Sequence, residues 1–221
     1  MSRVTAESER VQAQYRGYFA EPVFAVLGNP ANLYSNLLRH LAPFGVKVSN
    51  LSINLSVLAQ ANVSCFLSPT GIVRVWIDHL EVYLPDVSSQ KQVEQILTHA
   101  FAVMLETDES LRPMRHEATL HAWARLKEEP FSSYIRRFIK APDDSARWKP
   151  SVEFVQVGEG SVPIGSVRLE EATHIPEGLF VRSTVNLGSG APRADELISA
   201  FTDKLGAQLK AVDLDLPLRI E

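Results

Sequence analysis

Residues 116–121 read His-Glu-Ala-Thr-Leu-His, a stretch in which two histidines flank a glutamate. Zinc metalloproteases carry a related motif, in which two histidines four residues apart bind the metal and the glutamate acts as general base. Here His116 and His121 are five residues apart, so on a helix their side chains would point about 140° from each other. On a strand they would point to opposite faces. Neither geometry brings both imidazoles to one ion, so we expect no metal site here.

The remaining motifs give no chemical signature. The chain has no G-x-S-x-G stretch, no phosphate-binding P-loop and no G-x-G-x-x-G stretch. Cys65 alternates with the apolar residues Val63 and Leu67, which predicts a buried and inert thiol. We therefore predict no catalytic residue and no cofactor, and we favour a non-enzymatic protein while leaving the enzyme class open.

Composition and charge narrow the class of protein. The 221 residues are 45% hydrophobic and 22% charged, as in ordinary folded proteins. The formal net charge of -4 lacks the positive field that attracts phosphate backbones, so nucleic acid is not expected as a partner. No apolar run approaches the roughly 20 residues that cross a bilayer, so no membrane association is expected. The single cysteine fits a reducing compartment, and we expect a cytoplasmic protein.

The elements that must position any site follow from hydrophobic periodicity. In residues 1–19, apolar residues spaced seven, four and three apart predict a short N-terminal helix. The first half, residues 20–110, is predicted to contain strand 22–28, helix 31–41, strands 51–57, 62–68 and 72–85, and helix 88–106. Within 72–85 the alternating apolar residues change from odd-numbered to even-numbered positions, which predicts a bulge or bend near Asp78 and His79. Ser88 or Ser89 is expected to cap the helix that follows.

The second half, residues 111–221, repeats this order. It is predicted to contain strand 115–127, helix 130–140, strands 151–158, 161–172 and 179–188, and helix 192–212. The two halves therefore suggest an internal duplication of a β-α-β-β-β-α unit, and two unrelated α+β halves are the alternative. In either case we expect an α+β fold, with antiparallel sheet and helices packed on one face, as one continuous domain or as two.

Helices on one side of a sheet would leave the other face for recognition. Tryptophan and arginine are enriched where binding energy concentrates. The residues predicted on this binding face are Trp76, Trp123, His121, Glu117, Arg125 and Arg182. In the alternative interpretation, Trp76 and Trp123 fill the seam between the halves. A weaker anion site is predicted at Arg136 and Arg137, on the short helix of the second half.

These patterns favour a protein-interaction module, such as an adaptor, a chaperone-like protein or a complex subunit, that binds a protein partner or a second copy of itself. The alternative is a small-molecule-binding protein or enzyme with a pocket between a curved sheet and its long helix, where His121, Glu117 or Arg182 would fix a polar group.

Overall fold

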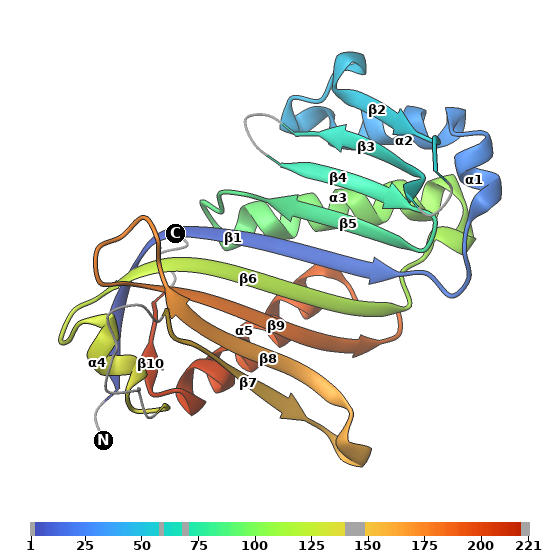
Figure 1. The fold of residues 1–221 in the computed structure, drawn as a ribbon. Helices are drawn as coiled ribbons and strands as arrows, with labels where there is room; N and C mark the ends of the chain where they lie inside the picture. Colours follow the sequence, from blue (N-terminus) through green and yellow to red (C-terminus); the bar gives the residue numbers. More distant parts are fainter. Residues whose placement is uncertain (1–2, 58–59, 68–70, 140–148, 218–221) are drawn as a thin grey trace. The chain divides into compact units, whose positions relative to one another are not determined.

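The computed structural model describes residues 3–57, 60–67, 71–139 and 149–217 (Figure 1). The strands are β1 Val4–Tyr18, β2 Leu51–Asn54, β3 Asn62–Phe66, β4 Ile72–Trp76, β5 His79–Leu84, β6 Arg115–Leu126, β7 Ser151–Val157, β8 Pro163–Glu171, β9 Gly178–Ser189 and β10 Leu214–Asp215. The α-helices are α1 Phe24–Gly28, α2 Ala31–Leu41, α3 Gln90–Thr107, α4 Phe131–Ile135 and α5 Ala194–Ala211. Short 3-10 helices lie at η1 Ala42–Phe44, η2 Val48–Asn50, η4 Glu109–Leu111 and η6 Glu159–Ser161. Within the described ranges, no helix combines the length and the apolar character that crossing a membrane requires.

The chain forms two compact units. The terminal unit comprises Met1–Gln12, Thr119–Asn186 and Phe201–Ile220, and the central unit comprises Ala13–Ala118 and Leu187–Ala200. Strands β1, β6 and β9 and helix α5 each pass from one unit into the other. The units therefore do not follow a division of the chain near residue 110, because each takes segments from both halves.

In the central unit, five strands pair in the order β2-β3-β4-β5-β1, and every pair is antiparallel. Helices α2 and α3 pack together behind these strands in Figure 1. Alternate strand residues such as Val63, Val73 and Leu80 are fully buried and form the core with α3 residues such as Ala100 and Val103. The intervening residues face away from the helices, and we call this the helix-free face of the unit.

In the terminal unit, four strands pair in the order β6-β9-β8-β7, and β10 pairs with the start of β1 in parallel, with Val4 opposite Leu214. The C-terminal part of α5 packs on one face. The inward residues Leu169 and Val181 are fully buried, and Leu205 and Leu209 of α5 are nearly so. Ser183 Oγ donates a hydrogen bond to Gln208 Oε1 at 2.5 Å, which ties β9 to α5. Among the described residues, no helix packs on the opposite face, which we call the helix-free face of the terminal unit.

The predicted α+β class with antiparallel pairing is confirmed. Helices α2, α3 and α5 and strands β6 to β9 lie where the periodicity predicts them, and Ser89 caps α3 by accepting a hydrogen bond from Gln92 N. Cys65 is fully buried as expected, and burial raises the pKa of its thiol to about 12.

Three predicted elements were wrong. Residues 3–19 form strand β1 instead of an N-terminal helix, and residues 22–28 contain helix α1 instead of a strand. Residues 72–85 form two strands, because β4 ends at Trp76 and β5 begins at His79. The change from odd-numbered to even-numbered apolar positions near Asp78 therefore marks a turn between two strands that pair with each other, with Val75 opposite Leu80.

The order of elements recurs along the chain. The first series is β1, α2, β3, β4, β5 and α3, and the second is β6, α4, β7, β8, β9 and α5. The strands also pair in corresponding orders, β3-β4-β5-β1 and β7-β8-β9-β6. The first series starts with β1, so it begins before residue 20, and α1 and β2 are additions to it.

Candidate functional site

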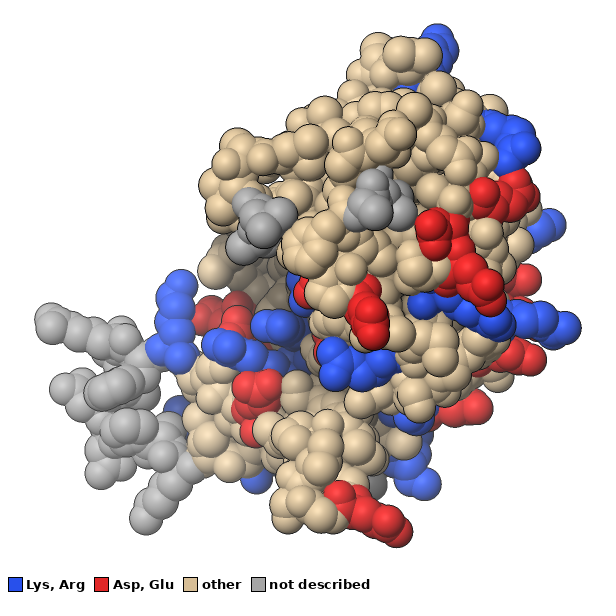
Figure 2. Space-filling view, turned by 90° about the vertical axis from the view of Figure 1, so that its right-hand side faces the viewer, with Lys and Arg blue, Asp and Glu red and all other residues tan. Residues whose placement is uncertain are grey.

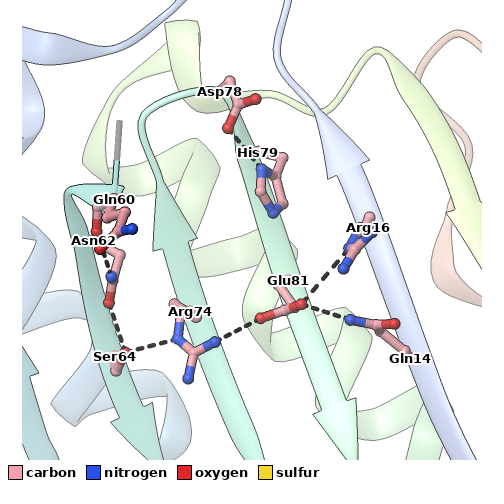
Figure 3. A network of polar contacts seen from close by, with 9 residues as sticks. All are labelled: Gln14, Arg16, Gln60, Asn62, Ser64, Arg74, Asp78, His79 and Glu81. Atoms are coloured by element: carbon pink, nitrogen blue, oxygen red, sulfur yellow. Dashed lines mark hydrogen bonds and ion pairs between the residues drawn. The ribbon is translucent and has the colours of Figure 1, made fainter. Parts of the chain in front are cut away.

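The helix-free face of the central unit carries a row of polar side chains around Glu81 (Figure 3). Strands β4 and β1 flank β5, and their register places Arg74 and Arg16 on either side of Glu81. Arg74 Nη1 donates a hydrogen bond to Glu81 Oε2 at 2.9 Å, and Arg16 Nε lies 3.6 Å from Oε1. Gln14 Nε2 donates to the same Oε1 at 2.6 Å. The carboxylate is only 8% exposed, and its hydrogen-bonding capacity is met inside the protein.

The row continues onto β3. Arg74 Nε donates to Ser64 Oγ at 2.9 Å, and Ser64 Oγ donates to Asn62 Oδ1 at 2.9 Å. Each charged side chain in the row thus has an oppositely charged or hydrogen-bonding partner. We call Ser64, Arg74, Glu81 and Arg16 the Glu81 row, and its contacts hold four strands in register.

Aromatic side chains lie next to the Glu81 row. The ring of His79 stacks on Trp76 with centroids 5.6 Å apart, and it lies 5.5 Å from the ring of Tyr18. Arg74 lies over the Trp76 ring and Arg115 over the Tyr18 ring. Trp76 is half-buried, so this predicted binding residue is partly occupied by contacts within its own unit.

The helix-free face of the terminal unit carries a second group of aromatic and basic residues. We call it the aromatic-arginine cluster, and its members are Arg10, His121, Trp123, Phe180 and Arg182. The rings of Trp123 and Phe180 have centroids 5.0 Å apart, and His121 lies 5.7 Å from Phe180. The Arg10 guanidinium lies over Trp123, 5.4 Å from the ring centroid. The three rings are half-buried and both arginines are exposed, so the cluster presents stacked rings and positive charge to solvent.

Arg182 differs from the other basic residues nearby. Its cross-strand neighbour on β8 is Arg168, which already forms an ion pair with Glu170 and donates to Ser151 Oγ at 3.1 Å. Arg125, on the same face of β6, pairs with Glu9 at 3.1 Å. Within the described part of the chain, the guanidinium of Arg182 has neither an ion-pair nor a hydrogen-bond partner. A positive charge without a counter-ion thus lies beside the aromatic rings.

His121 lies opposite Arg182, between two cross-strand contacts. Thr119 Oγ1 is 3.2 Å from Thr184 Oγ1 on one side, and Trp123 contacts Phe180 on the other. Burial lowers the pKa of His121, and the charge of Arg182 lowers it further. The imidazole is therefore neutral at neutral pH, with one N–H donor and one acceptor.

The two histidines of the 116–121 stretch have separate environments, as the strand interpretation predicts. His116 is buried in the central unit, where its Nδ1 lies 2.7 Å from Tyr15 Oη and its Nε2 lies 3.1 Å from Gly190 O. The carbonyl of Gly190 can only accept, so Nε2 carries the proton and Nδ1 accepts from the Tyr15 hydroxyl. His116 thus links β6 to the segment before α5.

The structure brings together three of the predicted binding residues, His121, Trp123 and Arg182. Trp76 and Glu117 belong to the central unit and are not members of this cluster. Arg125 is engaged by Glu9.

The two arginines of the predicted anion site, Arg136 and Arg137, have different contacts. Arg136 is exposed, whereas Arg137 pairs with Glu129 and lies over the Tyr134 ring. The charge of Arg137 is therefore compensated within the protein.

Three important residues were missed from the sequence. Phe180 has the same strand parity as Arg182 and could have been found from that alternation. Arg10 lies in the segment interpreted as a helix, which hid its strand neighbours. Glu81 lies just beyond the turn at Asp78. The sequence predicts one continuous strand there, so it does not indicate that Glu81 lies beside Arg74 on a neighbouring strand.

Comparison with known proteins gives little further guidance. No family model matches the chain, and no curated protein matches it in sequence. One solved structure that resembles it is that of a rolling circle replication initiator protein from Geobacillus stearothermophilus, with 9% identity, 93% of this chain and 84% of that chain covered, and a TM-score of 0.32.

The expectation that nucleic acid is not a partner is corrected by this match, because the matching structure is that of a replication initiator. A TM-score of 0.32 carries no argument about function, so no activity is transferred from that protein.

Proposed function

We propose that this chain is a non-enzymatic binding module, which holds a protein partner on the helix-free face of its terminal unit. The observation that supports the proposal is the aromatic-arginine cluster, in which half-buried Trp123 and Phe180 lie beside the uncompensated Arg182. Large aromatic side chains and arginines dominate the binding energy of protein interfaces, particularly where they form a contiguous patch. The cluster has this composition, and its side chains come from paired β-strands instead of loops.

Figure 2 draws the side of the molecule that lies on the right in Figure 1. On the face drawn in Figure 2, basic and acidic side chains are interspersed and do not form a field of one sign. Protein interfaces tolerate such mixed charge at their rims, where complementary pairs give specificity. A second copy of the chain is one form that the partner can take.

The alternative function, a ligand pocket between sheet and helix, would need different residues. His121 and Arg182 lie on the face opposite α5, so they do not border the space between β9 and that helix. The side chains that do face α5, such as Val181 and Ser183, are fully buried. A small-molecule site built from His121 and Arg182 would therefore have to lie on the helix-free face.

We also propose that the chain arose by internal duplication. The recurring element order and the corresponding strand orders support it. A reducing compartment such as the cytoplasm is proposed from the single, fully buried cysteine.

The test of the binding function compares matched variants. Wild-type protein purified from its own host would be studied by native mass spectrometry, which reports bound protein, self-association and bound small molecules together. Any protein that co-purifies would then be prepared pure and titrated by calorimetry. We expect Trp123→Ser to weaken binding by about 2 kcal/mol or more, a typical hot-spot value.

Leu105→Ser is the matched control, because Leu105 is an exposed apolar residue on α3, in the other unit. Equal binding by wild type and Trp123→Ser would refute the assignment of this face. A bound mass of a few hundred daltons, with no protein partner, would favour the small-molecule alternative.

A further inference from the structure

The recurring strand order allows residues of the two units to be compared by their register. In the central unit, the Glu81 row runs across β3, β4, β5 and β1. The corresponding strands of the terminal unit are β7, β8, β9 and β6. The register of β7, β8 and β9 aligns Glu153, Arg168 and Arg182, and the Thr119–Thr184 and Trp123–Phe180 contacts place His121 beside Arg182. We call these four residues the Arg182 row.

An aromatic pair at the same place in each unit supports this alignment of the two rows. Tyr18 on β1 lies directly opposite His79 on β5, two residues from Arg16 and from Glu81. Trp123 on β6 contacts Phe180 on β9, two residues from His121 and from Arg182. In each unit the aromatic pair thus lies next to the charged row, on the two strands that precede a helix.

The two rows share a residue type only on β4 and β8, and the change that matters for charge lies on the next strand. Arginine occupies the β4 and β8 positions, as Arg74 and Arg168, but the next strand carries Glu81 in one unit and Arg182 in the other. Glu81 supplies the carboxylate that Arg74, Arg16 and Gln14 share. In the terminal unit that place holds a second arginine, and like charges on directly opposed residues are unfavourable.

From this comparison we propose that Arg182, with the imidazole of His121 beside it, receives a carboxylate from an acidic peptide segment of the partner. Trp123 and Phe180 would contact an apolar side chain next to that carboxylate. This inference rests on the proposed binding function and adds the chemistry of the partner. The carboxylate of the partner would then neutralise the arginines of the Arg182 row, as the carboxylate of Glu81 neutralises Arg74 and Arg16 in the central unit.

Charge on the neighbouring strands favours an acidic peptide over a polynucleotide. Glu170 and Glu153 lie on β8 and β7, on the same face as Arg182, and Glu9 lies beside Arg125. A polyanion crossing this face would meet these carboxylates. A peptide with one or two acidic side chains needs only the local charge of Arg182, which binds carboxylate in a planar, two-pronged geometry.

The experiment is an NMR titration of the full chain, observed at the indole N–H of Trp123. The probes are a blocked peptide of alternating leucine and glutamate, the same peptide with glutamine for glutamate, and single-stranded oligothymidylate. We expect saturable binding of the acidic peptide, with the glutamine peptide at least about ten-fold weaker, because a charge-assisted hydrogen bond is lost.

Variants locate the carboxylate. Arg182→Gln is expected to weaken the acidic peptide about ten-fold and to leave the glutamine peptide unchanged. Arg125→Gln is the matched control, since Arg125 lies on the same face and already pairs with Glu9, and its affinity should stay within about two-fold. Arg182→Glu, which places a carboxylate in the row, should abolish binding while the spectrum of the folded protein is retained.

Each contrary outcome has its own meaning. Preferential binding of oligothymidylate would overturn the peptide assignment in favour of nucleic acid. Equal binding of both peptides would overturn the carboxylate assignment. If no peptide binds while capture of a partner still depends on Trp123, the inference fails and the proposed binding function stands.

Discussion

Glu81 shows how one buried carboxylate holds side chains from several strands. It joins Arg74 on β4 to Gln14 and Arg16 on β1, and Arg74 extends the network to Ser64 on β3. Removing one partner of a buried ion pair costs more than the pair contributes, because the remaining charges are left desolvated.

We therefore predict that Glu81→Gln lowers the free energy of unfolding by roughly 1–3 kcal/mol, although the side chain keeps its shape. Urea unfolding followed by circular dichroism measures the change. Glu153→Gln, an exposed residue in the corresponding row, is the control and should change stability by no more than about 0.5 kcal/mol. Equal stability of wild type and Glu81→Gln would show that the network is not stabilising.

His116 makes stability depend on pH. Burial lowers its pKa in the folded protein, so the unfolded chain binds a proton more readily than the folded one. Its contribution is fully present above the unfolded value of about 6.5 and is lost as the pH falls towards the folded pKa.

We accordingly predict that the free energy of unfolding decreases as the pH is lowered from 6.5 towards 5, by at most about 1.4 kcal/mol per pH unit for each proton taken up. His121 adds to this slope, because its pKa is lowered too. His116→Gln should flatten the pH dependence, whereas His174→Gln, at an exposed position, should not. An identical slope in the His116→Gln protein would contradict this role.

The charge at position 182 gives a third prediction. In Arg182→Glu, an acidic side chain would face Arg168 across β8 and β9, where two arginines now oppose each other. We expect a gain of roughly 0.2–1 kcal/mol in unfolding free energy, as for other cross-strand charge pairs. Thermal unfolding at low and high salt measures it, and the gain should shrink as salt is added. A loss of stability would mean that Arg182 is already stabilised in the folded chain.

For single residues, strand alternation predicts which side chains of the aromatic-arginine cluster share a face. It does not predict which side chains form ion pairs or hydrogen bonds across strands. His121, Trp123 and Arg182 share a parity on β6 and β9, so their common face follows from the sequence. The engagement of Arg125 by Glu9 and the gathering of donors on Glu81 depend on pairing between distant strands, which alternation alone does not specify.

Two glycines of the terminal unit, Gly165 and Gly206, differ in the space around their Cα atoms. A Cβ at Gly165 on β8 would lie 2.6 Å from Gln208 Nε2 and 2.7 Å from Thr184 O. A Cβ at Gly206 on α5 would meet no atom within 4 Å. Gly165 therefore allows β8 to approach β9 and α5, whereas Gly206 only lowers helix propensity.

We predict opposite effects for the two alanine variants. Gly165→Ala should cost roughly 1–3 kcal/mol, because the backbone carbonyl of Thr184 cannot move without disturbing the β8–β9 ladder. Gly206→Ala should add about 0.5–1 kcal/mol. Urea midpoints of both proteins measure these effects, and a stabilised Gly165→Ala protein would contradict the close approach.

The elements that were wrongly predicted share a physical cause. Along β1 the buried positions change parity, from Val4 and Ala6 to Val11 and Tyr15, so the alternation that identifies a strand is interrupted. The spacing that remains resembles a helix. The apolar run at 22–28 is short enough to fit either a strand or a buried helical turn, which periodicity cannot distinguish.

At the scale of the whole molecule, neither unit is a continuous stretch of chain. The terminal unit needs residues 1–12 as well as 119–186 and 201–220, and the central unit needs 187–200 as well as 13–118. Sequence periodicity locates elements, but it does not reveal which distant segments share a unit.

We predict that fragments 1–110 and 111–221 do not fold when each is produced alone. Each lacks strand partners and core residues that the other supplies. NMR spectra of the separate fragments should show the narrow dispersion of unfolded chains, and mixing them should restore dispersed signals. Cooperative unfolding of either isolated fragment would refute this prediction.

The pairing of Val4 with Leu214 has a consequence for how the protein is made. On a ribosome that adds about 5–20 residues per second, the start of β1 emerges roughly 10–40 s before β10 exists. During this interval the first strand of the nascent chain lacks its final neighbour. Completion of the terminal unit must therefore wait until residue 214 has been synthesised, long after its strand partner at residue 4.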